Sequence, residues 1–383
     1  MKILITSDLF TSTVNGVVTS VKNLWEELKS MGHDVRILTL SETINSHRDG
    51  DIYYIRSMPI GVVYPKMRMP LSYRHHLIKE IIEWSPDIIH SQCEFFSFQY
   101  ALRISKKTGA PIVHTYHTLY EQYVTYLIPN KRIGKRIVRS FSRRRLKKCR
   151  RVIAPTGKVE ETLLRYGLNN DISVIPSGIS LKQHQGRFTK NERSEKRLAL
   201  GIPDDAIVLI NLGRLGTEKN LDELIKYFPS VLERNANFMF MIVGDGPARE
   251  GLEKLASELG VKDKIIFTGM VAPAEVHDYY QLGDIFVSAS TSETQGLTYI
   301  EAAANGLPLL CRADPCLDDV LKDGENGYRY TCIEEFLEHI DAIANDHEWR
   351  ISAGKRSEEI AMAFDKSTFG TAMEKLYESI LQQ

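Results

Sequence analysis

The sequence predicts an α/β protein made of two parallel-sheet domains. Three observations support this. Strand-like runs alternate with helix-like runs from the first residue, a second series of the same kind begins near residue 206, and a polar stretch at 178–196 separates the two series. Short buried strands alternating with helices are typical of a parallel sheet covered on both faces. A length of 383 residues is enough for two cores of ordinary size. We therefore expect two Rossmann-like halves.

The first series opens with an apolar strand at residues 2–6. A helix follows, because its apolar residues recur at helical spacing and a glycine, Gly32, stands where a C-cap is expected. The helical positions are Val17, Val21, Leu24, Trp25 and Leu28. Further strands are expected at 35–40, 87–90, 112–115, 152–154 and 173–175.

The second series repeats the pattern after the polar stretch, which reads as an interdomain connection. Its strands are expected at 206–212, 238–243, 264–268, 285–288 and 307–311. Its helices are expected near 220–234, 247–260, 274–282 and 296–305, with a helical tail after about residue 345. We place the domains at 1–190 and 191–365, with a last helix at 366–383 packing back toward the first domain. Open α/β sheets bind ligands at the C-terminal ends of their strands, so a cleft between the two domains is the expected site.

The net charge of zero conceals a strong asymmetry between the halves. Residues 1–190 hold 30 Lys and Arg against 15 Asp and Glu, whereas the remainder holds 19 against 34. Such an asymmetry indicates a basic face that meets an anionic partner, either nucleic acid or a membrane. The 43% hydrophobic and 26% charged content is ordinary for a globular chain and excludes a disordered one.

Three features that the sequence lacks exclude further classes of protein. The sequence contains no run of 18 apolar residues, so no membrane-spanning helix is predicted. The N-terminus is charged too early for a signal peptide. The five cysteines are odd in number and show no CxxC pairing, so we expect reduced thiols in a cytoplasmic protein. No dense Asp/His cluster suggests a divalent metal site.

The most informative stretch is SETQGLTYIEA at 292–302, which follows the strand at 285–288 and opens a helix near Gly296. Backbone N–H groups at a helix N-terminus form a natural diphosphate site, and Gly296 lets the backbone approach closely. The N–H groups in question belong to Thr294, Gln295, Gly296 and Leu297. Glu293 precedes the helix and Glu301 lies inside it. The competing interpretation is two solvated glutamates around a loop.

A second stretch, NLGRLGTEKN at 211–220, also follows a strand directly. Arg214 and Lys219 are placed to reach the cleft, and they offer a bidentate fork and a point charge for phosphate oxygens. An exposed charged loop is the alternative. The stretch VGDGP at 243–247 lacks the third glycine of a dinucleotide fingerprint, so we prefer a tight turn that shapes the cleft wall. No GxxxxGK[ST] is present, which disfavours a P-loop NTPase.

Two residues stand out in the first domain. Gly16 opens a helix after the first strand, where its N–H could meet a phosphate, although a permissive turn glycine is equally simple. His117, in HTYHTLYEQY, lies at the C-terminal end of a strand, where it could contact a sugar or an acceptor. His114 is expected to be buried on the strand itself.

Together these features resemble the retaining nucleotide-sugar glycosyltransferases of family 4, which have the GT-B fold. The marks of the resemblance are the N-terminal NGV, then GRLGTEKN, VGDGP and FTGMV, and the E-x7-E motif SETQGLTYIE. The resemblance covers nearly the whole chain. Many members carry Pro before NGV, where this chain has residues 11–13, Thr-Ser-Thr.

The resemblance implies a UDP-sugar donor, retention at the anomeric carbon and no cofactor or metal. It implies that Arg214 and Lys219 bind the donor diphosphate and that Glu301 holds the ribose hydroxyls. It makes Glu293 and His117 the catalytic pair beside the reacting sugar. The remaining donor residues implied are Gly16 at the phosphate and Val271 at the base. The helix-start N–H groups of Thr294, Gln295, Gly296 and Leu297 complete the expected donor site.

A basic segment at 131–151 holds twelve Lys and Arg and no acid. Its apolar residues are spaced so that a helix carries an apolar stripe beside a cationic face, as membrane-surface helices do. The stripe is Ile133, Ile137, Val138, Phe141 and Leu146. The candidate membrane-binding residues are Lys135, Arg136, Arg139, Arg143, Arg144, Arg145, Lys147 and Lys148. A second set adds Lys66, Met67, Arg68, Met69, Arg74, His75, His76 and Lys79. A solvated helix is the alternative, and no nucleic-acid motif accompanies the charge.

Because the first domain handles the acceptor in this family, its positive charge suggests a lipid acceptor in an anionic bilayer. The motifs look most like bacterial diacylglycerol glucosyltransferases. We therefore expect UDP-glucose and 1,2-diacylglycerol as substrates, at the inner face of the cell membrane; no oligomeric state is predicted. The alternatives are another acceptor, such as a wall polymer, a glycolipid or a small polyol, or an inactive scaffold that binds membrane or polyanion.

Overall fold

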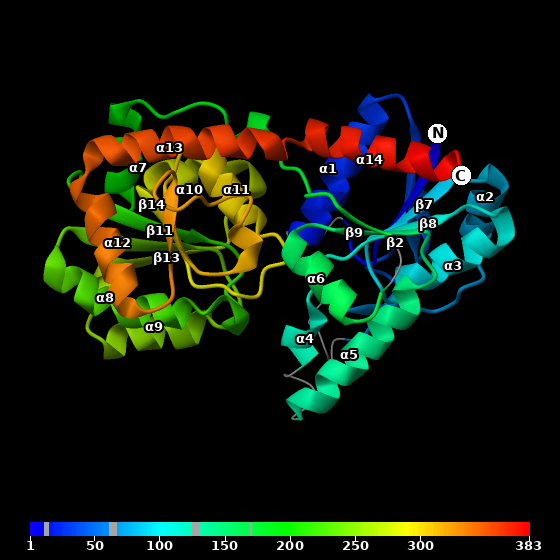
Figure 1. The fold of residues 1–383 in the computed structure, drawn as a ribbon, viewed down its shortest axis with the longest axis horizontal. Coiled ribbons are helices and arrows are strands. Elements are labelled where there is room, and N and C mark those ends of the chain that lie inside the picture. The colour runs from blue at the N-terminus through cyan, green and yellow to red at the C-terminus, as the bar shows by residue number, and fades with distance from the viewer. Residues whose placement is uncertain (11–14, 61–66, 125–129, 169–170) are drawn as a thin grey trace. The chain divides into compact units, whose positions relative to one another are not determined.

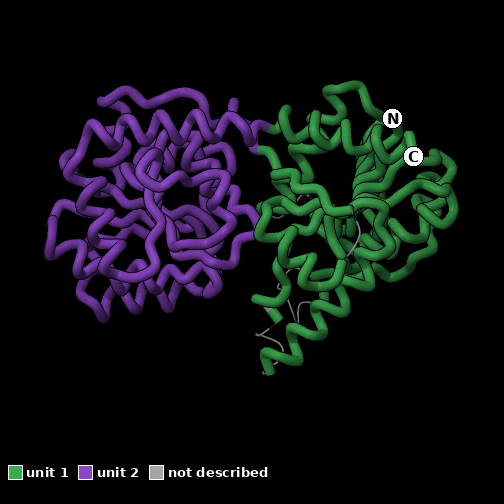
Figure 2. The backbone as a smooth tube through the Cα atoms, in the orientation of Figure 1, with its two compact units in different colours: residues 1–178, 366–383 green, residues 179–365 purple. Residues whose placement is uncertain are grey.

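The computed structural model describes residues 1–10, 15–60, 67–124, 130–168 and 171–383. The chain forms two compact units, one of residues 1–178 with 366–383 and one of residues 179–365 (Figure 2). Each unit is built on its own largely parallel sheet with helices packed on both faces (Figure 1). The predicted α/β class is therefore confirmed.

The first unit contains an eight-stranded sheet in the order β10-β9-β8-β7-β1-β2-β4-β3, in which only β3 and β4 pair antiparallel. A separate two-stranded antiparallel ribbon is formed by β5 and β6. The strands are β1 (Lys2–Thr6), β2 (Asp34–Leu40), β3 (His47–Asp49), β4 (Ile52–Ile55), β5 (Ser57–Pro59), β6 (Arg68–Pro70), β7 (Ile88–Ser91), β8 (Ile112–Thr115), β9 (Arg151–Ala154) and β10 (Ile172–Val174).

Strand β1 shows why helices cover both faces of this sheet. Successive side chains of a strand point to opposite faces, and all of those in β1 after Lys2 are buried. Ile3 and Ile5 pack with α1 and α14, while Leu4 packs on the other face with α2, α3 and α6. The helices are α1 (Gly16–Ser30), α2 (His76–Trp84), α3 (Phe96–Thr108), α4 (Tyr120–Tyr123), α5 (Lys131–Leu146), α6 (Gly157–Arg165) and α14 (Lys366–Leu381).

The last helix, α14, completes the core of the first unit by packing on α1 (Figure 1). Gly370 permits the contact, since a Cβ there would lie 2.4 Å from Glu27 Cγ. Ion pairs flank it, with Lys366 Nζ 3.1 Å from a Glu26 carboxylate oxygen. Gly178, where the chain first leaves this unit, also needs to lack a side chain, because a Cβ would lie 2.6 Å from the Cα of Lys366.

The second unit contains a six-stranded parallel sheet in the order β13-β12-β11-β14-β15-β16. Its strands are β11 (Ile207–Leu212), β12 (Phe238–Val243), β13 (Ile265–Gly269), β14 (Ile285–Ser288), β15 (Leu309–Arg312) and β16 (Gly327–Tyr330). Its helices are α7 (Lys190–Ala199), α8 (Leu221–Arg234), α9 (Arg249–Glu258), α10 (Val276–Leu282), α11 (Leu297–Ala304), α12 (Ile333–Asn345) and α13 (His347–Ala361). Every strand predicted from the sequence is present, with ends shifted by no more than two residues.

The chain divides after Gly178 and not at residue 190. The polar stretch predicted as a connection instead contains α7, which belongs to the second unit. Thr189 caps this helix in a capping box with Glu192. The buried guanidinium of Arg197 donates to the carbonyl oxygens of Leu282 and Ala206. Hydrogen bonds from arginine, and not an apolar stripe, attach this helix to the rest of the unit. Hydrophobic periodicity could therefore not reveal it.

Candidate active site

The loop after β14 leads directly into α11 at the C-terminal edge of the six-stranded sheet. Gly296 is the N-cap of α11 and has a φ of 75°. A Cβ at this position would lie 2.4 Å from the ring of Tyr299. The left-handed backbone and the close packing both require glycine. The predicted helix start is confirmed, with Glu293 ahead of it in the loop.

Glu293 is held by two donors at a single carboxylate oxygen. Its Oε1 lies 2.5 Å from Lys219 Nζ and accepts a hydrogen bond of 2.8 Å from Ser290 Oγ. Lys219 ends the short turn after β11, and β11 is the neighbour of β14 in the sheet. Two residues predicted separately, 74 positions apart, are therefore in direct contact. Ser290 was not predicted; its place just beyond the end of β14 is the available signal.

The two loops are joined a second time through Glu218. Its carboxylate forms an ion pair with Arg214, and its backbone oxygen accepts a 3.1 Å hydrogen bond from Ser292 Oγ. The carboxylate of Glu218 is nearly buried, while 40% of the Arg214 side chain is exposed. The guanidinium thus lies at the surface of the loop, anchored by an acid that the sequence analysis missed.

Glycines bring the turns after β11, β12 and β13 together. A Cβ on Gly244, which has a φ of 130°, would lie 1.9 Å from the backbone oxygen of Gly213. The Gly244 N–H donates to the oxygen of Gly269 at 3.0 Å. A Cβ on Gly246 would lie 2.4 Å from the oxygen of Leu215. The VGDGP stretch is the predicted tight turn, and the structure shows that it packs backbone on backbone beside the Arg214 loop.

Glu301 lies inside α11, where its carboxylate is largely desolvated. Tyr280 of α10 donates a hydrogen bond of 3.0 Å to its Oε2. Burial raises the pKa of Glu301 to about 7, and the Tyr280 hydrogen bond opposes that rise. Glu301 therefore exchanges a proton near neutral pH. Tyr280 is a second residue that the sequence analysis missed.

The other predicted donor residues of this unit lie at the same C-terminal edge. Gln295 is buried, whereas Thr294 and Leu297 are half-buried at the start of α11. Val271 follows β13 and packs partly on the core of the unit. The edge therefore combines two cations, two carboxylates and a helix N-terminus, a set that can bind a diphosphate and hydroxyl groups.

In the first unit, Gly16 opens α1 at the C-terminal end of β1. Asn15 is the N-cap, and its Oδ1 accepts a hydrogen bond of 2.9 Å from the N–H of Val18. This places the backbone of Gly16 in the first turn of the helix. Residues 11–14, which include the Thr-Ser-Thr segment, and Lys66 of the second cationic set lie outside the described chain.

His117 lies just beyond β8 and contacts Gln92, which follows the neighbouring strand β7. The His117 Nε2 and Gln92 Oε1 atoms are 2.7 Å apart. Burial, with a smaller contribution from His114, lowers the pKa of His117 to about 3. Its imidazole is therefore neutral at physiological pH. His114 is fully buried on β8, as predicted, with Nε2 3.2 Å from an oxygen of Glu94.

Family models and curated relatives agree on what this chain resembles. The model "Glycosyltransferase Family 4" matches residues 14–183, and "Glycosyl transferases group 1" matches residues 192–360. An α-monoglucosyldiacylglycerol synthase of Acholeplasma laidlawii is 32% identical across all of this chain and 98% of that protein. One of Streptococcus pneumoniae is 35% identical across 86% of this chain and 75% of that protein.

The chain belongs to glycosyltransferase family 4. Solved structures agree on the architecture. A glycosyltransferase of Rickettsia africae superposes with a TM-score of 0.78 at 18% identity, covering 100% of this chain and 98% of that one. The Anabaena protein HepE in complex with UDP and glucose gives 0.77 at 17% identity, covering 99% and 100%. This glycosyltransferase therefore has the predicted GT-B fold.

The basic helix of this glycosyltransferase is α5 (Figure 1). It starts after its N-cap Asn130 and is amphipathic. Val138 and Leu146 face the unit's interior, whereas Ile133 and Ile137, one turn apart, are 52% and 51% exposed. The predicted single stripe is thus divided between two faces. Most of the predicted membrane-binding cations are exposed, namely Lys135, Arg136, Arg139, Arg143, Arg144, Lys147 and Lys148.

Two cations of the segment depart from the predicted pattern. Arg145 turns inward, with its guanidinium carbon 5.1 Å from the ring centre of Phe141 and 5.8 Å from that of Phe98. Lys135 lies 4.0 Å from a carboxylate oxygen of Glu121 on α4. The sequence could not show these contacts, because Phe98 and Glu121 come from other elements.

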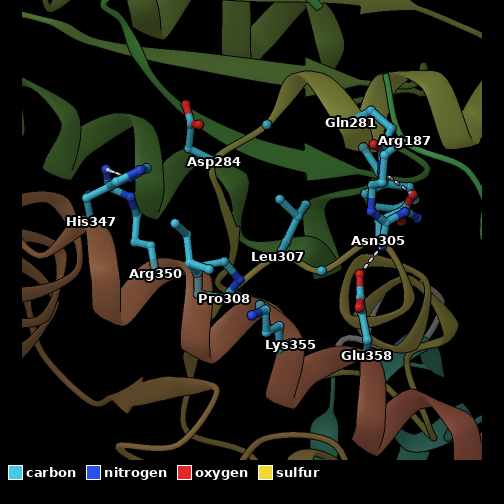
Figure 3. Close-up of a pocket in the computed structure, with 15 residues that line it drawn as sticks. Arg187, Gln281, Asp284, Asn305, Leu307, Pro308, His347, Arg350, Lys355 and Glu358 are labelled. Atoms are coloured by element: carbon cyan, nitrogen blue, oxygen red, sulfur yellow. Dashed lines mark hydrogen bonds and ion pairs between the residues drawn. The ribbon is translucent and has the colours of Figure 1, made fainter. Parts of the chain in front are cut away.

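A hollow of about 310 Å³ lies at the opposite edge of the six-stranded sheet, next to Asp284 and Pro308, which precede β14 and β15 (Figure 3). Its arginines already have partners within the unit. Arg187 is ion-paired with Glu358, and Arg350 donates to the backbone oxygen of Ile343. The hollow is therefore a structural feature separate from the Glu293 site.

No helix among the described residues is both long enough and apolar enough to cross a bilayer. No group of three or more His, Cys, Asp and Glu side chains among the same residues is arranged to hold a metal ion.

Proposed function

We propose that this glycosyltransferase moves a hexose from a UDP-sugar to 1,2-diacylglycerol in an anionic membrane, and that the hexose is glucose. The product would be an α-glucosyl lipid. The names of the two bacterial relatives support this acceptor, since they match the chain across most of its length. The abundance of cations in the first unit supports a lipid surface.

The contact between Lys219 and Glu293 carries the proposal. We infer that Lys219 and Arg214 bind the donor diphosphate and that Glu293 contacts the transferred sugar. A nucleotide sugar places those two groups next to each other, as the loops after β11 and β14 place these side chains. When a diphosphate attracts Lys219, the carboxylate of Glu293 becomes available to sugar hydroxyls.

The leaving diphosphate would be stabilised by protein groups alone. The N–H groups of residues 294–297 and the positive end of the α11 dipole add to the charges of Arg214 and Lys219. We therefore expect neither a metal ion nor a cofactor beyond the UDP-sugar. Such donors act where charge develops, as the bond to the anomeric carbon breaks.

The other donor contacts follow from the same proposal. Glu301 would accept hydrogen bonds from the ribose hydroxyls, and Val271 would contact the base. Gly16 would offer its N–H to a phosphate. His117, neutral because of its burial, would exchange a hydrogen bond with a hydroxyl of the transferred sugar.

Retention at the anomeric carbon needs either two inversions or attack on the side that the leaving group vacates. No residue is assigned as a covalent nucleophile. We propose front-face attack, in which the acceptor oxygen bonds to the anomeric carbon as the diphosphate departs. The acceptor hydroxyl gives its proton to a diphosphate oxygen, so that atoms and charge balance.

We propose that α5 holds the enzyme on the inner face of the cell membrane. Exposed Lys and Arg contribute roughly 1 kcal/mol each near an anionic surface. Ile133 and Ile137 lie on the exposed face of the same helix, and such residues enter the headgroup boundary when amphipathic helices bind.

A screen of donors against acceptors tests the proposal. UDP-glucose, UDP-galactose and UDP-N-acetylglucosamine would each be offered with diacylglycerol in anionic micelles, a glycolipid, a wall polymer and a small polyol. Product mass and anomeric configuration would be determined, with and without EDTA. An α-glucosyl-diacylglycerol formed in EDTA is expected. Transfer to another acceptor only would leave a family 4 enzyme with a different substrate, and a β-linked product would contradict the mechanism.

A further inference from the structure

The connection from β7 to α3 places a buried amide against His117. Gln92 is only 2% exposed, and its Oε1 is the atom 2.7 Å from His117 Nε2. An amide oxygen accepts hydrogen bonds and cannot donate. The proton of the neutral imidazole is therefore on Nε2, which donates to Gln92, and Nδ1 is the acceptor nitrogen.

The surroundings of His117 favour this neutral form. The titratable side chains on the neighbouring elements include His90 on β7, His114 on β8, Cys93 and Glu94 after β7, Tyr116 after β8 and Tyr120 on α4. Both carboxylate oxygens of Glu94 are engaged, one 3.2 Å from His114 Nε2 and the other accepting from Tyr120 at 2.5 Å. His90 is bonded to Thr115 and has a pKa well below its ordinary value because of burial.

The same connection also fixes the loop that carries His117. Glu94, 1% exposed, bonds to His114 before that loop and to Tyr120 after it. The loop is thus tied at both ends to Glu94, while Gln92 holds the imidazole between them. One short segment therefore holds the imidazole of His117 through Gln92 and the two ends of its loop through Glu94.

Gln92 also has a feature that a purely structural residue lacks. Among the described residues its Nε2 has no hydrogen-bond partner, although the atom is buried. An unpaired buried donor reduces stability. The contribution of this side chain to the fold is therefore poorer than that of an apolar residue of the same size, and its contact with His117 is what distinguishes it.

We propose that Gln92 is a positioning residue for sugar transfer, fixing the tautomer and orientation of His117 so that Nδ1 is the nitrogen that accepts a hydrogen bond from a substrate hydroxyl. This inference rests on the proposed role of His117. The substrate class concerned is the hexosyl donor and its hydroxyl-bearing acceptor.

The first test replaces Gln92 with Met, which keeps the length of the side chain and removes both polar atoms. We expect kcat for transfer to fall at least tenfold while the unfolding temperature stays equal or rises, because the unpaired donor is gone. Gln183→Met, an exposed position of the second unit, is the matched control and should keep wild-type kcat. An unchanged kcat in Gln92→Met, or a lower unfolding temperature in step with the loss of activity, would overturn the inference.

Two further measurements separate positioning from other effects. In Gln92→Glu, a carboxylate would favour the charged imidazole, so transfer relative to wild type should decline as the pH is lowered from 8 to 5.5. In a His117→Ala background, Gln92→Met should have no further effect. Two results would contradict an action through His117. One is a further loss of kcat when Gln92→Met is added to His117→Ala, and the other is an activity of Gln92→Glu relative to wild type that does not change with pH.

Long-range ¹H–¹⁵N NMR of the histidine ring tests the geometry without any substrate. His117 should carry its proton on Nε2 in the wild type and lose that preference in Gln92→Met. A proton on Nδ1 in the wild type would overturn the inference. If the proton is found on Nε2 but no donor–acceptor pair reacts, the proposed function is wrong, whereas the contact between Gln92 and His117 is confirmed.

Discussion

Lys219 Nζ lies 2.5 Å from Glu293 Oε1, in an ion pair that joins the turn after β11 to the loop after β14. The two side chains come from neighbouring parallel strands, so the register of the sheet sets their separation. Ser290 holds the same carboxylate oxygen. The pair keeps a cation and an anion together at the place where we propose that a charged leaving group and a sugar are bound.

Replacing Glu293 with Ala should reduce transfer by at least ~100-fold, the range found when one preorganised electrostatic contact to a transition state is removed. The fold should persist, because the loop remains joined to the β11 turn through Ser292 and the backbone of Glu218. Initial rates and a thermal melt would measure both. Glu258→Ala, an exposed glutamate at the end of α9, is the matched control. Near-normal turnover in Glu293→Ala would remove this residue from the site.

The convergence of Lys219 and Glu293 could be anticipated from the sequence because it depends on short-range features. Strand-like runs ended at known points, and charged residues followed them. The partners that tune the site could not be anticipated in this way. Tyr280 contacts Glu301 from another helix, and within the first unit Gln92 contacts His117 from another connection, both through tertiary packing. Glu218 lies beside Lys219 in the same turn, but its residue type alone carries no distinguishing signal.

The same distinction holds for the fold. The buried strands of both sheets were predicted to within two residues, because burial on both faces leaves continuous apolar runs. Strands β3 to β6 and β16, none of which is buried along its whole length, were not predicted. Helix α7 was missed because Arg193 and Arg197 fix it through Asp284, and charged residues in a polar stretch indicate a linker by composition.

Donor affinity should depend on pH through Glu301. Its pKa is raised to about 7, so the carboxylate is mainly protonated at pH 6 and mainly ionised at pH 8. An ionised carboxylate is the better acceptor for two ribose hydroxyls. We therefore expect KM for UDP-glucose to fall several-fold between pH 6 and pH 8. Tyr280→Phe removes the hydrogen bond that opposes the rise of the pKa and should move this transition to higher pH. A pH-independent KM would contradict the role of Glu301.

Ionisation of Glu301 should have the opposite effect on folding stability, which it lowers. The pKa of Glu301 is higher in the folded protein than its ordinary 4.5, so the unfolded chain loses its proton first as the pH rises. Folding stability is therefore lost between about pH 4.5 and pH 7 on account of this residue. Glu301→Gln should raise the unfolding temperature at pH 8 relative to wild type and leave it nearly unchanged at pH 4.5. Equal shifts at both pH values would show that ionisation is not involved.

Charge reversal on the exposed face of α5 should release the enzyme from membranes. Replacing Arg139, Arg143 and Arg144 with Glu changes the local charge by six, against roughly 1 kcal/mol of attraction for each surface cation. Sedimentation with vesicles that contain phosphatidylglycerol should show loss of binding, and the same vesicles in high salt should release the wild type. Reversal of three exposed cations of the second unit, Lys226, Lys254 and Arg356, is the control. Unchanged vesicle binding in the α5 variant would exclude this helix as the anchor.

Arg145 and Arg144 should behave differently although they are adjacent. The guanidinium of Arg145 lies over Phe141 and Phe98, so Arg145→Ala removes packing as well as charge and should cost roughly 1 kcal/mol of folding stability. Arg144 is exposed, and Arg144→Ala should weaken vesicle binding with no measurable change in the denaturation midpoint. Urea unfolding and vesicle sedimentation of the two variants measure the contrast. Equal effects in both assays would mean that the inward orientation of Arg145 has no energetic consequence.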